Sequence, residues 1–185
     1  GTWPRKAGSV DDLQKAWRGE DGELPTGDFG FCRYGGFAAT KADATGFFRV
    51  EKRDGRWWFV DPDGHLFLSL GADVIQPEMT TPAAGRDAFF RQRPPAAVLP
   101  ARERGGDRGV SFFTWNLLRR FGEGWPAAWV DHTLRRMDAW GLNTVANWSS
   151  PRLWEAKRKP YVVPLESWID GVSYLDLPDV WSEGF

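Results

Sequence analysis

The sequence predicts an α/β fold, the N-terminal portion of a (β/α)₈ TIM barrel that this chain leaves incomplete. Between residues 66 and 164 the apolar and polar patterns alternate in the order strand, helix, strand, helix, strand. This order favours parallel strands joined by right-handed crossovers. A complete barrel takes about 250 residues. The 185 residues of this chain, which include a long N-terminal arm, are too few to close one.

The overall composition excludes several classes of partner. The net charge of -1 gives no electrostatic reason to expect nucleic acid or an anionic membrane surface. Apolar runs such as "FLSLGADVI" are far shorter than the roughly 20 residues that cross a bilayer. Residues 1–30 show no signal-peptide pattern, although a mature secreted chain would look the same. The single cysteine, Cys32, excludes an internal disulfide framework and a thiolate metal cluster. We expect no cofactor and no metal.

The first 45 residues are predicted to form an irregular arm, and residues 46–185 the first part of the barrel. Within the arm, "VDDLQKAWRG" favours a short helix with Val10, Leu13 and Trp17 on one side and Gly19 as its end. The stretch "DFGFCRYGGF" is rich in glycine and aromatic residues. It indicates an irregular segment held in place by packing of its rings.

A β-hairpin follows, with strands at residues 56–60 and 66–70 on either side of "DPDG". Pro62 presets the backbone for the first central position of a turn, and Gly64 accepts a positive φ. His65 is therefore interpreted as a turn residue rather than a catalytic base. The second strand runs on into "GADVIQPE" and is taken as the first parallel strand of the barrel.

The second half of the chain contains a long excursion, two helices and two further strands. Residues 79–111 are rich in Pro, Arg and Gly, and loops of this length are usually functional or mobile. A helix is predicted from Pro126 to a C-terminal cap at Gly141, with Leu134 and Met137 on its apolar stripe. A strand at 144–147, a helix that begins after Ser150 and a buried strand at 161–164 complete the pattern.

Polar and aromatic residues follow the predicted strand ends, where barrel active sites are built. These residues are Asp73, the group Asn147, Trp148 and Ser149, and the pair Glu166 and Trp168. A dinucleotide-binding sheet is disfavoured, because "GADVIQPE" holds one glycine and no helix start. Twelve tryptophans are far more than usual for this length. Some belong to the core, and others suit stacking against the C–H face of a sugar ring.

The motifs "TGFFRVEKRDGRWWFVDPDGHLFLSLGADV", "NLLRRFG" and "MDAWGLNTVANWS" resemble β-agarases and β-galactosidase-like glycoside hydrolases of the large retaining (β/α)₈ clan. The similarity runs from about Tyr34 to the end of the chain. In that clan the general acid/base carboxylate follows strand four and the nucleophile follows strand seven. The resemblance therefore implies that neither catalytic carboxylate lies in this chain, and Glu78, Glu166 and Glu183 match no catalytic position.

What the resemblance implies for this chain is a share of a sugar-binding site. The substrate would be a galactan-type oligosaccharide or polysaccharide, and a secreted or periplasmic location is favoured over a cytoplasmic one. The candidate substrate-binding residues are Asp73, Asn147, Trp148, Ser149 and Trp168. The remaining barrel strands would come from the same protein or from a second chain. Three alternatives stay open: a self-contained carbohydrate-binding module, one chain of a nicked or split hydrolase, and polar groups that only satisfy local backbone at strand ends.

Overall fold

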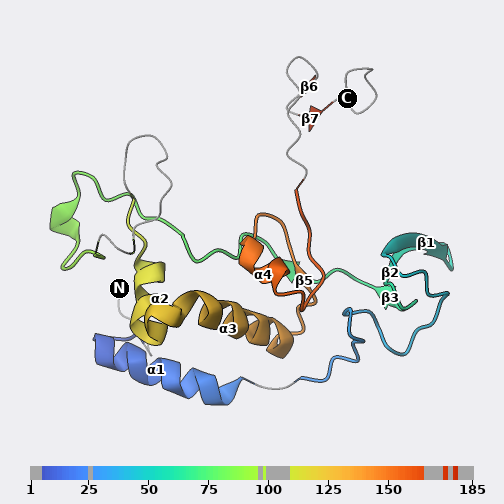
Figure 1. Cartoon of the computed structure of the whole chain (residues 1–185), viewed down its shortest axis with the longest axis horizontal. Helices are drawn as coiled ribbons and strands as arrows, with labels where there is room; N and C mark the ends of the chain where they lie inside the picture. The colour runs from blue at the N-terminus through green and yellow to red at the C-terminus, as the bar shows by residue number, and fades with distance from the viewer. Residues whose placement is uncertain are drawn as a thin grey trace.

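The computed structural model describes residues 6–24, 27–95, 98, 109–164, 173–174 and 177–178. Figure 1 shows helices α1 to α3 at one end, the small sheet β1–β3 at the other, and β5 with α4 between them. Among the described residues, no helix has the length and apolarity needed to cross a membrane. The elements are α1 Val10–Glu23, β1 Arg49–Arg53, β2 Arg56–Val60, β3 Leu66–Phe67, β4 Gly71–Ala72, η1 Asp87–Phe89, α2 Phe112–Phe121, η3 Gly122–Gly124, α3 Trp125–Ala139, β5 Thr144–Val145, α4 Pro151–Glu155, β6 Ser173–Tyr174 and β7 Leu177–Pro178.

The N-terminal arm contains a longer helix than the sequence predicted. Ser9 caps α1 by accepting a hydrogen bond from the Asp12 N–H, and the helix then continues through Gly19 to Glu23. The predicted end at Gly19 is wrong. A glycine inside a helix costs only about 1 kcal/mol relative to alanine, which contacts with neighbouring helices can outweigh.

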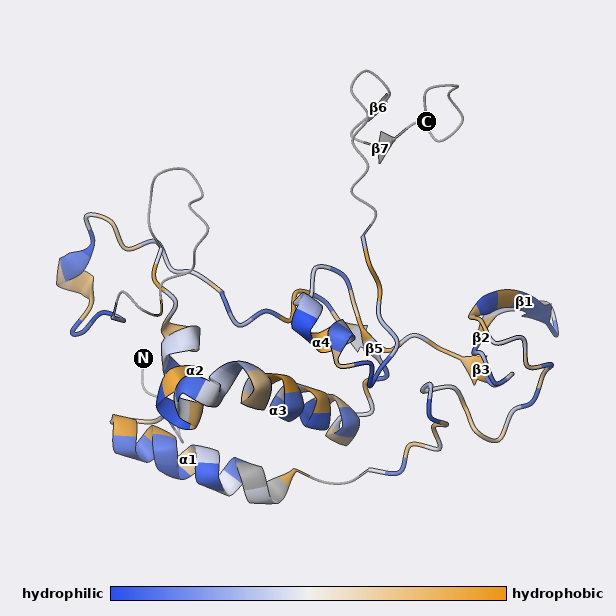
Figure 2. Cartoon of the chain, in the orientation of Figure 1, coloured by the Kyte–Doolittle hydropathy of each residue, from blue (hydrophilic) through white to orange (hydrophobic). Residues whose placement is uncertain are grey.

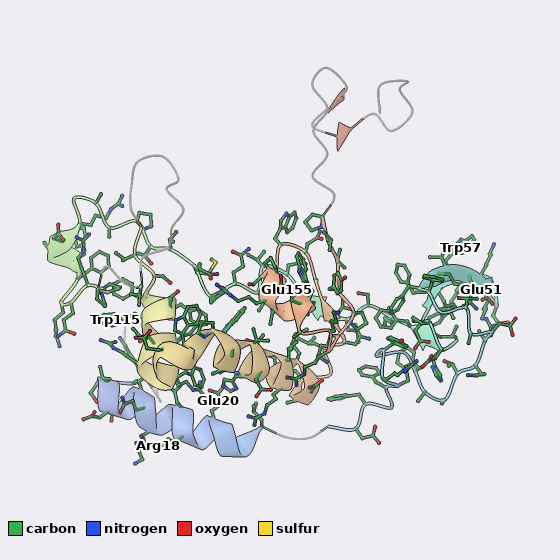
Figure 3. All side chains as sticks on the ribbon, viewed as in Figure 1. Arg18, Glu20, Glu51, Trp57, Trp115 and Glu155 are labelled. Carbon is green, nitrogen blue, oxygen red and sulfur yellow. The ribbon has the colours of Figure 1, made fainter. Side chains whose placement is uncertain are left out.

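Those contacts are made by Glu20. Its carboxylate accepts hydrogen bonds from Arg120 of α2, at 3.1 Å, and from Arg136 of α3. Figure 3 shows Glu20 on the side of α1 that faces α2 and α3, with Arg18 on the opposite side. Burial raises the pKa of Glu20, but hydrogen bonds and positive charge from Arg136 and Arg120 outweigh it and lower the pKa overall. This ion cluster holds α1 against the other two helices.

The predicted hairpin is confirmed, with one strand more than expected. Strand β2 pairs antiparallel with β3, and β1 pairs antiparallel with the other side of β2. Strand β1 was missed by the sequence prediction. It joins β2 through Asp54 and Gly55, which both have positive φ values, of 49° and 79°. Two such residues are typical of the tight turn that suits the twist of a hairpin.

The "DPDG" turn depends on its glycine. Gly64 has a φ of +92°, and its N–H donates to the Asp61 carbonyl at 3.0 Å. A Cβ atom at this position would lie 2.3 Å from the Ala42 carbonyl oxygen. The turn therefore packs directly against the backbone of the arm, and no larger residue fits without movement of one of the two segments.

The parallel strands begin later in the chain than predicted. The predicted strand at residues 66–70 is wrong in its extent, because pairing with β2 ends at Phe67. The parallel partner of β5 is instead β4, in which Gly71 lies opposite Thr144 and Ala72 opposite Val145. A Cβ atom on Gly71 would lie 2.5 Å from the Thr144 carbonyl oxygen, so a glycine permits this close approach. Three residues thus separate two sheets that the sequence pattern had merged.

The hydrophobic core lies between the helices and the parallel strands. Its buried members come from α2, α3, β5 and α4: Leu117, Trp129, Leu134, Met137, Val145 and Leu153. The predicted stripe of α3 is confirmed, because Leu134 and Met137 are almost fully buried. Figure 2 shows how α2 and α3 combine hydrophobic (orange) and hydrophilic (blue) residues. Helix α2 was not predicted, although Ser111 caps its start and Gly122, with a φ of +62°, ends it.

The third predicted strand pairs as expected but is not buried. Tyr161 forms a parallel bridge with Val145. However, Tyr161, Val162 and Val163 are 52%, 40% and 48% exposed. The expected burial is wrong for this chain, because in the part that the structure describes no further strand pairs with this edge. The result is an open, apolar strand edge next to the core.

Candidate functional site

The C-terminal ends of β4 and β5 lie side by side, and several of the polar residues singled out from the sequence follow them. The Ala146 N–H donates to the Ala72 carbonyl at 3.1 Å, and the Val74 N–H donates to the Asn147 carbonyl at 2.8 Å. These two bonds bring Asp73, which is exposed, next to Asn147 and Trp148. Residues more than 70 positions apart in the chain therefore share one edge of the parallel sheet.

Asn147 has an unused hydrogen-bond acceptor. The residue is half-buried, and its side-chain Oδ1 is buried without a hydrogen-bond partner among the described residues. An unsatisfied buried acceptor costs about 1–3 kcal/mol. The free Oδ1 therefore does not stabilise the fold. A hydrogen-bond donor on a bound molecule would satisfy it. Asn147 is thus suited to accept a hydrogen bond from a ligand hydroxyl.

Trp148 is presented to solvent by an uncommon backbone conformation. Its φ of +55° lies in the left-handed region, and its side chain is 54% exposed. The side-chain Nε2 of Gln76, in the segment after β4, donates to the Trp148 carbonyl and so helps to hold the backbone at Trp148 in place. Val74 also has a φ of +55°, which is a genuine outlier for a β-branched residue. Strain of this kind, about 1–3 kcal/mol per residue, clusters at functional sites.

Ser149 points into the protein and already has a partner. It is only 4% exposed, and its Oγ accepts a hydrogen bond from the Ile75 N–H at 3.2 Å. The Ser150 N–H donates to the Ile75 carbonyl at 2.9 Å, so these residues tie the two strand ends together. Ser150 occupies the predicted N-cap position of α4, but its side chain makes no capping hydrogen bond.

Several charged or polar groups around this edge were not predicted. Arg152 of α4 donates to the Glu78 carboxylate at 2.5 Å, so this carboxylate is held in an ion pair. Gln76 and Arg152 carry no distinguishing sequence signal beyond their places shortly after a strand end and at a helix start. Trp168, Glu166 and Glu183 lie outside the described residues.

The long segment after β4 is anchored close to this edge. The Thr114 hydroxyl of α2 donates to the Pro77 carbonyl at 2.6 Å, and both Thr114 and Ser111 are buried. Farther along, Thr81 and Val110 pair through two backbone hydrogen bonds of 2.8 and 2.9 Å. The excursion predicted at residues 79–111 therefore leaves and returns at one point beside the strand ends.

A cavity of about 470 Å³ lies at the other end of the parallel strands. Its lining includes Asn143, which precedes β5, and Lys159 and Pro160, which precede the third strand. Asp138, also in the lining, accepts a hydrogen bond from Lys159 at 2.6 Å. Because these residues lie before the strands and the polar edge lies after them, the cavity is separate from the candidate site.

Comparison with known proteins shows that this chain is similar to agarases in sequence and in structure. It is 29% identical to Beta-agarase B of Vibrio sp. (strain JT0107) over 91% of its length, and 30% identical to Beta-agarase A of the same organism over 78%. The solved structure of an agarase, AgWH50C, superimposes with a TM-score of 0.77 and 28% identity over 86% of the chain. No protein-family model matches the chain.

The resemblance to β-agarases that the motifs indicated is therefore confirmed. The chain spans about a fifth of the two curated relatives, 21% of Beta-agarase B and 17% of Beta-agarase A. It covers 27% of the AgWH50C structure. The similarity thus concerns one segment of much longer proteins.

Proposed function

We propose that this chain supplies the first strands, and part of the substrate-binding wall, of a (β/α)₈ glycoside hydrolase of the agarase type. The agreement with AgWH50C in both sequence and shape is the observation that carries the proposal. The parallel pairing of β4 with β5, followed by the bridge to Tyr161, fits the opening strands of a barrel. The open edge after Tyr161 is where the next strand would pair.

The substrate would be a β-galactosidic chain such as agarose or its oligosaccharides. Asn147 would accept a hydrogen bond from a sugar hydroxyl, Trp148 would stack on a pyranose ring, and Asp73 would accept from neighbouring hydroxyls. Ser149 would position the site indirectly, because its hydrogen bond to Ile75 joins the two strand ends. Trp168 would add a second stacking surface. A retaining mechanism uses two carboxylates about 5 Å apart, one as nucleophile and one as acid/base. Both would lie in the remainder of the barrel.

A self-contained carbohydrate-binding module is the weaker candidate. Binding modules of that kind are mostly antiparallel sandwiches, whereas this chain packs two helices against parallel strands. A nicked or split hydrolase, with the remaining strands on a second chain, fits the same geometry as a single longer chain. Both versions place the same residues at the sugar site.

The experiment compares two exposed tryptophans in the longer protein that contains this chain. Trp148 lies at the proposed sugar site, while Trp140, 60% exposed, lies at the C-terminal end of α3 before β5 begins. Hydrolysis of agarose oligosaccharides is measured by reducing-end release. Loss of one aromatic stacking surface is worth about 1 kcal/mol, so Trp148→Ala should lower kcat/KM roughly fivefold. Trp140→Ala should leave it unchanged.

Two results would contradict the proposal. If the longer protein released no reducing ends from agarose oligosaccharides or aryl β-galactosides, the agarase assignment would fail. If both tryptophan variants lost activity equally, the strand ends would have no special role in binding.

A further inference from the structure

A second group of reactive side chains lies away from the strand ends, where the arm meets the hairpin. Cys32 belongs to the arm, while Asp61 is the first residue of the "DPDG" turn and His65 follows it directly. Asp61 Oδ2 lies 2.8 Å from Cys32 Sγ and 3.4 Å from His65 Nδ1. One ligand atom from each of the three residues lies within 4.8 Å of the other two. Sequence spacing does not reveal this group, because its members come from two separate segments.

The charge of Asp61 has an incomplete set of partners. The residue is 0% exposed, and its Oδ1 accepts hydrogen bonds from the backbone N–H groups of Asp63 and His65, at 2.9 Å each. Among the described residues, Oδ2 lies against the Cys32 thiol and the His65 imidazole. In the part of the chain that the structure describes, no lysine or arginine pairs with Asp61, since Arg33 binds Asp63 instead. Buried charges are normally paired with a cation or bound to a metal, so a bound cation would complete the surroundings of this carboxylate.

We propose that Cys32, Asp61 and His65 bind a Zn²⁺ ion. Thiolate, carboxylate and imidazole are the three kinds of ligand that zinc takes in proteins, and softness of the sulfur disfavours Mg²⁺ and Ca²⁺. His65 Nδ1 is buried and has no hydrogen-bond partner among the described residues, so it is available as a ligand. This inference does not depend on the proposed agarase function.

To hold the ion, the thiol of Cys32 has to shift relative to the other two ligands. Zinc bonds of about 2.0 Å to oxygen or nitrogen and 2.3 Å to sulfur place tetrahedral ligand atoms roughly 3.3–3.5 Å apart. The 3.4 Å separation of Asp61 Oδ2 and His65 Nδ1 already meets this requirement. Cys32 Sγ, now 2.8 Å from Oδ2, would move away by about 0.7 Å. The site uses three protein ligands, and Cys32 also lines the 470 Å³ cavity, from which water can supply the fourth.

The surroundings support the ligands in the way that metal sites require. The two backbone N–H groups on Oδ1 fix the carboxylate, which is the outer hydrogen bonding that orients a ligand. A Cβ atom on Gly36 would lie 2.5 Å from Asp61 Oδ2 and 2.9 Å from His65 Cβ, so the glycine lets the arm approach the turn. The ion would then join the arm to the hairpin.

Zinc binding should release a proton from the thiol. In the structure Cys32 Sγ donates a hydrogen bond to Asp61 Oδ2 at 2.8 Å, so the metal-free group carries its proton. The ion displaces this proton when the thiolate forms. Affinity should therefore fall as the pH is lowered.

The test uses the full-length protein, stripped with a chelator and titrated with Zn²⁺ by calorimetry and with Co²⁺ by absorption. We expect a site that gives a thiolate-to-cobalt charge-transfer band. Cys32→Ser should abolish the band and weaken zinc binding by about 100-fold or more, since a direct ligand matters at least as much as an outer partner. Serine can still donate to Asp61, so folding should persist. His65→Gln should weaken binding similarly, whereas His132→Gln, on α3, is the matched control and should not.

Two outcomes would overturn the site. The first is a wild-type protein whose zinc affinity and cobalt spectrum match those of Cys32→Ser. The second is binding that His132→Gln weakens as much as His65→Gln does. Either result would mean that Cys32, Asp61 and His65 do not together bind a metal ion.

Discussion

Replacement of Asn143 by alanine should destabilise the protein more than any change at the sugar site. Asn143 is 2% exposed and precedes β5. Its Oδ1 accepts from the Leu70 N–H at 2.8 Å, and its Nδ2 donates to the carbonyls of Gly35 and Leu68, both at 2.9 Å. One side chain thus joins the arm, the hairpin exit and the parallel sheet.

The expected magnitude follows from the three backbone groups that the substitution leaves without partners. An unpaired buried group costs about 1–3 kcal/mol. Leu68 and Leu70 are 50% and 40% exposed, so water can reach part of this region and reduce the penalty. We therefore expect Asn143→Ala to lower the free energy of unfolding by about 2–4 kcal/mol.

The assay is urea or thermal unfolding of the full-length protein, followed through the transition that includes these residues. Asn147→Ala is the matched control beyond the other end of β5, because its Oδ1 has no partner among the described residues to lose. The control should change stability by less than about 0.5 kcal/mol. A free energy of unfolding for Asn143→Ala within that margin of wild type would refute the reasoning.

Three further predictions concern the arm, the turn and the open edge. Because the folded pKa of Glu20 lies below its ordinary value of 4.5, its bonds to Arg120 and Arg136 stabilise the protein above that pH and lose this effect as the pH falls through the folded pKa. Glu20→Gln should therefore lower the melting temperature at pH 7, with a difference from wild type that shrinks below about pH 4.5; a constant difference would contradict the cluster. Gly64→Ala should reduce stability by at least about 1 kcal/mol in denaturant unfolding, because of its positive φ and the contact with Ala42, and an unchanged midpoint would argue against the turn. The isolated 1–185 chain should aggregate and show no hydrolysis of agarose oligosaccharides, since its strand edge is open and the proposed function places both catalytic carboxylates outside it. A soluble monomer with a cooperative transition or measurable turnover would count against an incomplete barrel.

Local signals in the sequence were enough for the turns and for the longest interior helix. Pro62 and Gly64 predicted the hairpin turn, and Gly141, whose φ is +69°, predicted the end of α3. Strand β1 could also have been found, because Asp54 and Gly55 form a strong hairpin signal. Helix α2 likewise had a capping serine before it and a glycine after it.

Features set by tertiary contacts could not be predicted in this way. The boundary between β3 and β4 depends on which neighbour each strand pairs with. A continuous run of apolar residues does not indicate the pairing partner. The extension of α1 beyond Gly19 depends on arginines about 100 residues away. The same holds for the group of Cys32, Asp61 and His65, which only the folded arm brings together. At the candidate site, Asn147 and Trp148 were anticipated from their place after a strand, but the inward direction of Ser149 was not.

The most direct test of a sugar site at the strand ends is Asn147→Ala in the longer active protein, with kinetics and melting temperature measured on the same sample. If Asn147 hydrogen-bonds substrate, its loss should weaken transition-state binding by roughly 1–3 kcal/mol and so lower kcat/KM about 5- to 150-fold on agarose oligosaccharides. The melting temperature should stay that of wild type. A clear fall in melting temperature with unchanged kcat/KM would remove Asn147 from the site and contradict this account.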